Sequence, residues 1–254
     1  MKQRVISGIF IAAITVIAAY FGGFILKAIL SFVAIYGSYE FIKIRQSRFN
    51  TLLFAIMALC IMGIYLLHDY ATVIMLLELI LLLTIAVFDE KETFDDVATV
   101  LLMTIMLGYS LYFMSSIQEE NKYMFGYVLI ISYLTDVFAY FIGIRFGKHK
   151  LNTRVSPKKT IEGSLGGWFF GFLTSFIWAS IFHYFGKPSY VLLLASLFLP
   201  LVSEVGDLVF SLIKRHYGVK DFSNLIPGHG GILDRLDSHI FCTLLFGALL
   251  ILFS

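Results

Sequence analysis

Carboxylates and cations are concentrated in one glycine-rich stretch, SLIKRHYGVKDFSNLIPGHGGILDRLDS, which lies between two strongly apolar runs. Its charged residues are Asp221, Asp234, Asp237, Lys214, Arg215, Lys220 and Arg235, and Asp207 lies just before it. Gly228, Gly230 and Gly231 surround His229 in a turn opened by Pro227. Hard divalent cations prefer oxygen ligands, and cations beside glycine N–H groups suit phosphates. The stretch predicts a site for a metal ion and a nucleotide at a membrane surface.

Asp207 and Asp234 are the candidate metal ligands, because they flank the glycine-rich stretch from two antiparallel apolar segments. Asp207 shares a helix face with Glu204, one turn before it, and with Lys214, two turns after it. Two acids one turn apart repel each other unless a metal ion intervenes or Glu204 is protonated, and both explanations stay open. Asp234 also shares a face with Asp237, although acids at a helix start can simply neutralise the helix dipole.

Asp136 lies inside another apolar run, ISYLTDVFAYF. At ~1.5 Å per residue it lies roughly 15 Å from the polar boundary near Gly147. An ionisable group at such depth is costly and indicates a functional site. The alternative is an acid that is protonated or paired inside the bundle, with Tyr133 or Tyr140 as partner.

The connection GKHKLNTRVSPKKTIE carries five cations: Lys148, Lys150, Arg154, Lys158 and Lys159. Anchoring to anionic lipid headgroups would explain all five. A second explanation is that SPKKT presents Lys158 and Lys159 to a phosphate, and the loop alone does not decide between the two. We expect the cations of both polar loops to be solvated in the resting protein. Gly163, Gly167 and Gly171 follow at a spacing of four, which predicts close packing of two helices.

The composition indicates an integral membrane protein. Of the 254 residues, 59% are hydrophobic and 14% are charged, whereas soluble domains carry about 25% charged residues. A membrane-spanning helix needs ~20 mainly apolar residues, so we expect about nine spans in an all-α, polytopic bundle. They lie near residues 5–21, 24–42, 51–67, 71–88, 97–117, 123–146, 164–184, 189–213 and 236–253. We expect one membrane-embedded catalytic domain over residues 1–254, in which residues 1–122 form a scaffold and residues 123–254 carry the active site.

The distribution of Lys and Arg predicts a cytoplasmic N-terminus. With that orientation only Lys27, Lys122 and Lys187, of the 19 Lys and Arg residues, lie outside. The two long polar connections, near 147–163 and 214–235, then face the cytoplasm, where nucleotides are. Cys60 and Cys242 lack the spacing of a disulfide framework or a zinc site. Nothing predicts nucleic-acid binding, because the cations lie in loops at a membrane.

The segment Lys214–Asp237 closely resembles the signature of the bacterial-type phosphatidate cytidylyltransferases, also called CDP-diacylglycerol synthases. The matching parts are KR, KD, PGHGG and DRLD, and the likeness continues upstream in VSEVGD, SPKKTIEG and DVFAYFIGIRFGKHKL. It covers at least the C-terminal half, whereas the N-terminal half matches only in being hydrophobic. Glu204 departs from the pattern, since a neutral polar residue is expected there.

The resemblance implies a homodimeric enzyme of the bacterial inner membrane that condenses CTP with phosphatidic acid, giving CDP-diacylglycerol and pyrophosphate. It implies Mg²⁺ held by Asp207 and Asp234, with a second, monovalent cation (K⁺) near the paired acids. The expected catalytic residues are Lys214, Arg215, Lys220, Asp221 and Asp237. The expected substrate-binding residues are Asp136, Lys158, Lys159, Gly228, His229, Gly230, Gly231 and Arg235.

Two other classes of protein are alternatives to this one. An ion-coupled transporter would use the intramembrane carboxylates for H⁺ or Na⁺, but inverted repeats are not detectable. Another membrane lipid enzyme, a polyprenol kinase or a CDP-alcohol phosphotransferase, is the third possibility. The phosphotransferase would need a longer array of aspartates than this sequence has.

Overall fold

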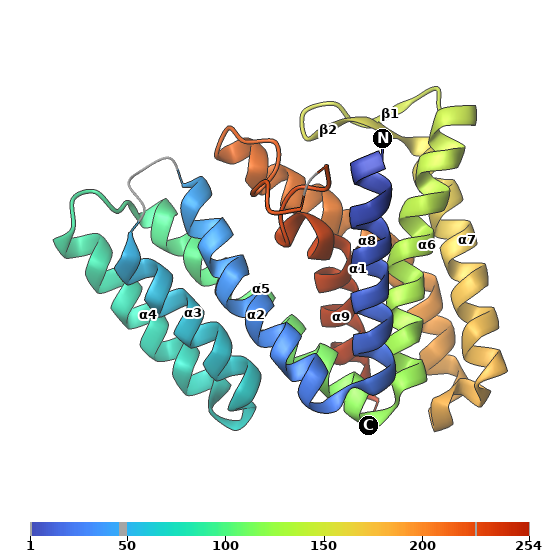
Figure 1. Cartoon of the computed structure of the whole chain (residues 1–254), viewed down its shortest axis with the longest axis horizontal. Coiled ribbons are helices and arrows are strands. Elements are labelled where there is room, and N and C mark those ends of the chain that lie inside the picture. Colours follow the sequence, from blue (N-terminus) through green and yellow to red (C-terminus); the bar gives the residue numbers. More distant parts are fainter. Residues whose placement is uncertain (1, 46–49, 227, 254) are drawn as a thin grey trace. The chain divides into compact units, whose positions relative to one another are not determined.

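The computed structural model describes residues 2–45, 50–226 and 228–253, of which residues 2–6 are described by backbone alone. Within these ranges the chain forms nine α-helices, two short 3₁₀ helices and one β-hairpin (Figure 1). The α-helices are α1 (Lys2–Phe21), α2 (Gly23–Ile44), α3 (Thr51–Leu66), α4 (Ala71–Phe88), α5 (Phe94–Glu120), α6 (Lys122–Phe146), α7 (Ile161–Ile181), α8 (Ser189–His216) and α9 (Leu233–Leu252). The 3₁₀ helices are η1 (His68–Tyr70) and η2 (His183–Gly186).

The all-α membrane bundle predicted from the sequence is confirmed. In the described part of the chain, each predicted span corresponds to one α-helix, with ends that differ by a few residues. By length and composition, seven helical segments there could cross a membrane. The apolar parts of α1 and α3, Ser7–Phe21 and Thr51–Leu66, are shorter. The number of spans and the cytoplasmic N-terminus remain predictions.

Two compact units make up the chain. The first unit comprises Met1–Ser115 together with Asp221–Leu233, and the second comprises Ser116–Lys220 together with Asp234–Ser254. The predicted glycine-rich stretch is therefore divided, because its middle belongs with the N-terminal helices. Each unit is described by itself below, and the predicted division into a scaffold and a catalytic half remains a prediction.

In the second unit, α6 and α7 pack closely through the predicted glycine face. Gly163, Gly167 and Gly171 are all buried. A Cβ atom added at Gly167 would lie 2.7 Å from the Thr135 carbonyl oxygen and 2.8 Å from the Ala139 Cβ atom. The prediction that these glycines serve helix packing is confirmed. Residues of α6 and α7 thereby come close enough to line one cavity.

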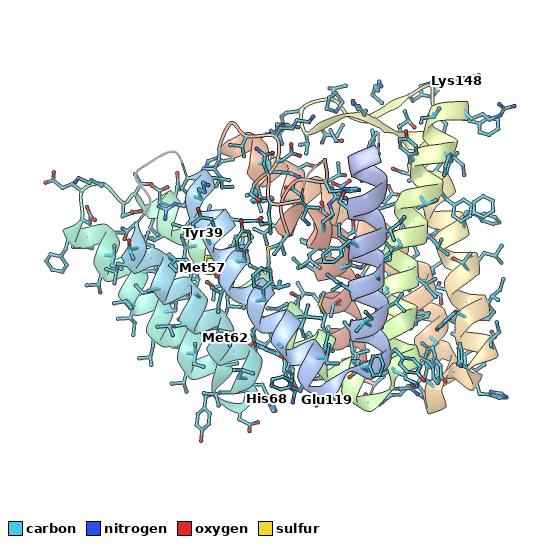
Figure 2. The ribbon with its side chains drawn as sticks, viewed as in Figure 1. Tyr39, Met57, Met62, His68, Glu119 and Lys148 are labelled. Carbon is cyan, nitrogen blue, oxygen red and sulfur yellow. The ribbon has the colours of Figure 1, made fainter. Side chains whose placement is uncertain are left out.

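A β-hairpin connects α6 to α7, where the sequence predicted only a loop. Strands β1 (Lys150–Asn152) and β2 (Ser156–Thr160) pair antiparallel. The Asn152 side chain closes the turn, since its Oδ1 accepts from the N–H groups of Arg154 and Val155 at 3.1 and 3.2 Å. Figure 2 shows Lys148, just before β1, and Glu119, at the end of α5, at opposite ends of the second unit. The hairpin thus lies at the end of the unit where α6 ends.

In the first unit, a buried ion-pair network joins the end of α2 to the start of α5. The Arg45 guanidinium pairs with the carboxylates of Glu92 and Asp96. Asn50 caps α3 by accepting from Leu52 N–H, and its Nδ2 donates to Glu92 Oε1 at 3.0 Å. Buried charges are stable only when they are paired and hydrogen-bonded in this way. The network holds the polar ends of the first unit's helices together.

Candidate active site

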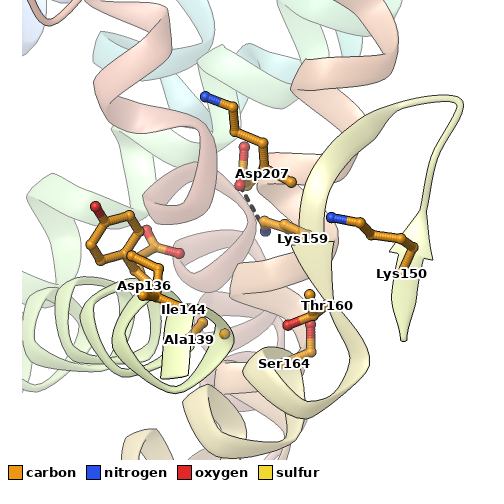
Figure 3. Close-up of a pocket in the computed structure, with 11 residues that line it drawn as sticks. Asp136, Ala139, Ile144, Lys150, Lys159, Thr160, Ser164 and Asp207 are labelled. Atoms are coloured by element: carbon orange, nitrogen blue, oxygen red, sulfur yellow. Dashed lines mark ion pairs between the residues drawn. The ribbon is translucent and has the colours of Figure 1, made fainter. Parts of the chain in front are cut away.

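A cavity of about 560 Å³ opens in the second unit, between α6, the hairpin, α7 and α8 (Figure 3). It is lined by Asp136, Ala139, Tyr140, Gly143, Ile144, Lys150, Lys158, Lys159, Thr160, Ser164 and Asp207. The structure therefore brings together four of the predicted site residues, which come from three separate stretches of sequence. The volume of the cavity is within the usual range of small-molecule sites, about 300–1,000 Å³.

Lys159 and Asp207 form an ion pair across this cavity (Figure 3). Lys159 Nζ lies 2.7 Å from Asp207 Oδ2, and the two side chains are 20% and 29% exposed. Burial of the Lys159 ammonium lowers its pKa, but the carboxylates of Asp207, Asp136 and Glu204 more than offset this effect and hold the pKa above its ordinary value. Lys159 is therefore a cation at neutral pH and can bind an anionic ligand.

Asp136 projects from α6 into the same cavity. Its Oδ2 accepts a hydrogen bond from Ser238 Oγ of α9 at 3.2 Å. Tyr133 and Tyr140, the partners considered from the sequence, make no hydrogen bond to Asp136 among the described contacts. Tyr140 does line the cavity. The carboxylate is accessible from the cavity, and the functional role of Asp136 remains a prediction.

Lys214 is buried, and the expectation that it is solvated is wrong. Helix α8 continues past it to His216, so Lys214 belongs to the same helix as Asp207, as the sequence predicts. Its Nζ donates to Asp234 Oδ1 at 2.7 Å, and the two side chains are only 9% and 2% exposed. By contrast, Arg215, Lys220 and Arg235 are exposed, as expected of loop or surface cations. Lys214 and Asp234 form a buried ion pair between α8 and α9.

Helices α8 and α9 approach each other closely at the level of Asp207. A Cβ atom at Gly206 would lie 2.8 Å from the Asp237 carbonyl oxygen. Asp237 is partly buried and interacts electrostatically with Asp207, Lys214 and Asp136. Asp237 thus lies electrostatically between the two ion pairs, Lys159–Asp207 and Lys214–Asp234.

Glu204, the position that departs from the family pattern, lies near the Lys159–Asp207 ion pair. Its side chain is buried, and its Oε1 has no hydrogen-bond partner among the described residues. The carboxylate interacts electrostatically with Lys159 and Asp207. A Cβ atom at Gly167 would lie 2.9 Å from Oε1, so the helix-packing glycines also make room for Glu204.

The rest of the predicted site belongs to the first unit. Gly228 and Gly230 adopt φ angles of 79° and 84°, which favour glycine. The N–H groups of His229 and Gly230 donate to the Ile226 carbonyl oxygen at 2.9 and 3.1 Å, so the turn itself uses both of them. The ring of His229 is held by Ser7, whose Oγ lies 2.7 Å from Nδ1. Asp221 is exposed, and Pro227 lies outside the described residues.

Sequence reasoning missed several residues. Thr160 and Ser164 line the cavity, and Ser238 contacts Asp136. Glu40 of α2 is fully buried and hydrogen-bonds to the glycine-rich stretch. A glutamate within an apolar span is a signal that could have identified Glu40, but its partners are too distant in sequence to be predicted.

The donor chemistry of the second unit suits a hard cation. Asp207, one of the two predicted ligands, offers carboxylate oxygens at the cavity wall beside Asp136. Asp234, the other, does not line the cavity and is buried against Lys214. Among the described residues, no group of three or more His, Cys, Asp or Glu side chains is arranged to hold a metal ion by itself. Mg²⁺ usually binds to one or two carboxylates and completes its shell with water and substrate phosphates, so this arrangement fits Mg²⁺ bound with a nucleotide.

A family model covers almost the whole chain. The model described as the cytidylyltransferase family matches residues 2–253. This chain belongs to the cytidylyltransferase family. The match includes the N-terminal half, which carried no specific motif.

Curated relatives agree along the full length. The chain is 32% identical over 271 residues to the phosphatidate cytidylyltransferase of Bacillus subtilis (strain 168), with 100% of this chain and 99% of the relative covered. It is 33% identical over 259 residues to the phosphatidate cytidylyltransferase of Staphylococcus aureus (strain COL), with 99% of each chain covered. It is 34% identical over 260 residues to the enzyme of the same name from Staphylococcus epidermidis, again with 99% of each covered.

Proposed function

We propose that this chain transfers the CMP moiety of CTP to phosphatidic acid, giving CDP-diacylglycerol and pyrophosphate. The observation that carries the proposal is the composition of one cavity. Lys158, Lys159 and Asp207 supply charge at the hairpin end, whereas Tyr140 and Ile144 supply an apolar wall on a membrane helix. Such a cavity suits an acceptor that has a phosphate at one end and acyl chains at the other. Membership of the cytidylyltransferase family and the names of the full-length relatives support CTP and phosphatidic acid as the substrates.

The reaction needs positive charge and alignment more than an enzyme nucleophile. A phosphate oxygen of phosphatidic acid attacks the α-phosphorus of CTP, a new P–O bond forms, and the bond to the β-phosphate breaks so that pyrophosphate leaves. Because two anions must meet, cations that hold both substrates in line lower the barrier. Lys159 is charged at neutral pH and lies in the cavity beside Lys158, so both can bind substrate phosphates.

Asp207 and Asp234 are the proposed Mg²⁺ ligands, with K⁺ near the same acids. When bound, Mg²⁺ would neutralise charge on the nucleotide phosphates and on the departing pyrophosphate. One oxygen of each aspartate is engaged by a lysine, Asp207 Oδ2 by Lys159 and Asp234 Oδ1 by Lys214. The lysines thus hold both carboxylates in place. Arg215, Lys220, Asp221 and Asp237 are the proposed remaining catalytic residues.

The chain is a multi-pass membrane protein, and we place it in the bacterial inner membrane with the cavity toward the cytoplasm. The excess of Lys and Arg in the connections on the hairpin side supports this orientation. It would give CTP direct access from the cytoplasm, while the lipid substrate enters from the bilayer. A homodimer is the proposed assembly.

The two alternative functions gain no support from family membership. A transporter would use the carboxylates of the cavity for ions, but it would not need the lysines beside them. A lipid kinase that uses CTP would transfer the γ-phosphate to an alcohol, so its lipid product would carry no cytidine.

The test is an assay of the purified protein in detergent with CTP labelled in the cytosine ring. With phosphatidic acid and Mg²⁺, we expect the label to move into the lipid phase, and with diacylglycerol in its place we expect no transfer. Addition of a chelator should abolish the transfer. Label that stays water-soluble in every arm would overturn the proposed function, and transfer that persists without a divalent cation would overturn the Mg²⁺ site alone.

A further inference from the structure

Glu40 of α2 is a buried carboxylate that contacts one distant segment of the chain three times and does not line the proposed substrate-binding cavity. Its side chain is 0% exposed. Oε1 accepts from Ser223 Oγ at 2.5 Å and from Ile232 N–H at 2.9 Å, and Oε2 accepts from Leu233 N–H at 2.9 Å. All three donors come from the glycine-rich stretch, about 180 to 190 residues later in the chain.

The backbone around these contacts is fitted to the carboxylate. A Cβ atom at Gly231 would collide with both oxygens of Glu40. One turn earlier on α2, Gly37 leaves room for the Leu233 side chain, since an added Cβ atom would lie 3.2 Å from its Cδ2. Gly231, one of the glycines expected to contact phosphate, therefore has a separate role, which is to admit Glu40.

The segment that Glu40 holds leads directly to residues of the proposed site. Gly228, His229 and Gly230 lie between the Ser223 and Ile232 contacts, and Asp234 follows Leu233 in the chain. The N–H groups of Ile232 and Leu233 lie at the start of α9, where backbone donors have no partner within the helix. A carboxylate that accepts from them fixes where the turn ends and where the helix begins.

We infer that Glu40 is a positioning residue for CMP transfer, acting through the glycine-rich segment 223–233 without touching substrate. This inference rests on the proposed function. A buried acceptor with three donors restrains the segment in one conformation, and misplacement of catalytic groups by about 1 Å can cost a hundredfold in rate. Loss of Glu40 should therefore lower kcat more than it raises KM.

The central variant is Glu40→Gln. Its side-chain NH₂ group must face the N–H group of either Ile232 or Leu233, so one hydrogen bond is lost. We expect kcat per folded molecule to fall at least about tenfold, with KM for phosphatidic acid changed less than about twofold. The matched control is Glu78→Gln, because Glu78 is also buried in the first unit but accepts from Thr104 of α5 instead of from the loop. The control should keep its kcat. Folded protein is quantified by gel filtration, since a merely structural role would reduce its amount and leave the kcat of folded molecules unchanged.

Limited trypsin digestion after Lys220 gives a readout that does not depend on the reaction. Lys220 is exposed and lies just before the restrained segment, so cleavage there should be several-fold faster in Glu40→Gln and unchanged in Glu78→Gln.

If Glu40→Gln does not fold, Ser223→Ala removes only one partner of Glu40 and should still lower kcat about threefold. An active wild type whose variants keep both kcat and the digestion rate would overturn the inference alone. A wild type without CMP transfer would overturn the proposed function, while the digestion would still report whether Glu40 holds the segment.

Discussion

At the scale of single residues, two lysines that look alike in the sequence have different surroundings. Lys159 lies in the cavity and pairs with an accessible aspartate, whereas Lys214 is buried between two helices with Asp234. Removing one partner of a buried ion pair leaves an unpaired charge in a medium that solvates it poorly. The two lysines should therefore respond differently to the same substitution.

Lys214→Ala should destabilise the protein by about 3–5 kcal/mol, because it strands the buried Asp234 carboxylate. Lys187→Ala is the control, since Lys187 pairs with Glu120 where the side chains are 27% and 47% exposed. Surface pairs contribute about 0–1 kcal/mol. The measurement is thermal unfolding in detergent. Equal melting temperatures for the two variants would contradict the burial of the Lys214–Asp234 pair.

Lys159→Ala should instead lower kcat/KM for CTP by roughly ten- to a hundredfold, since a charge-assisted phosphate contact is worth about 1.5–3 kcal/mol. Arg154→Ala is the matched control, because Arg154 is an exposed cation at the turn of the same hairpin and does not line the cavity. It should keep near-normal efficiency. Equal losses in both variants would favour lipid anchoring as the role of the hairpin cations.

The sequence allowed much of the site to be predicted at this scale. Asp136 was predicted from its depth in an apolar span, Asp207 from its place beside the glycine-rich stretch, and Lys158 and Lys159 from the SPKKT loop, and the four share one cavity. The burial of Lys214 was not predictable from a segment boundary at residue 213, three residues before the helix ends at His216. Glu40 was missed because its partners lie more than 180 residues away, and contacts of that range leave no periodic pattern.

At the scale of elements, hydrophobic length and glycine spacing were sufficient to predict the helices. Spans of ~20 apolar residues are the strongest pattern a membrane sequence carries, and each predicted span corresponds to a helix in the described part of the chain. The hairpin was missed because its strands, of three and five residues, are mostly polar. Its geometry depends instead on the Asn152 turn and on Glu162, whose carboxylate accepts from Lys148 N–H at 3.0 Å.

The close approach of α6 and α7 predicts that an added side chain at the contact lowers the stability of the protein. Gly167→Ala places a Cβ atom 2.7 Å from the Thr135 carbonyl oxygen, so the helices must separate, at a cost of about 1–3 kcal/mol. Gly126→Ala is the control, since its Cβ atom would meet only the Trp178 ring at 3.3 Å. We expect a clear fall in melting temperature for Gly167→Ala alone. A Gly167→Ala variant as stable as the wild type would contradict the tight helix contact.

At the scale of the whole molecule, orientation in the membrane decides whether the site can meet its nucleotide. In a Cys60→Ala, Cys242→Ala background, Asn152→Cys and Asn224→Cys each place a thiol at an exposed position of one long connection. Both thiols should resist a membrane-impermeant reagent in intact cells and react after permeabilisation, because positively charged loops stay in the cytoplasm. Labelling of both from outside would invert the proposed topology.

The central claim is that this cavity transfers CMP, and the fate of each CTP phosphate tests it most directly. Purified protein is incubated with phosphatidic acid, Mg²⁺ and CTP labelled at either the α- or the γ-phosphorus, with Asp207→Asn alongside the wild type. We expect wild-type protein to move the α-label into the lipid phase, to leave the γ-label in water as pyrophosphate, and Asp207→Asn to do neither. Transfer of the γ-label to lipid, or undiminished transfer of the α-label by Asp207→Asn, would contradict the account.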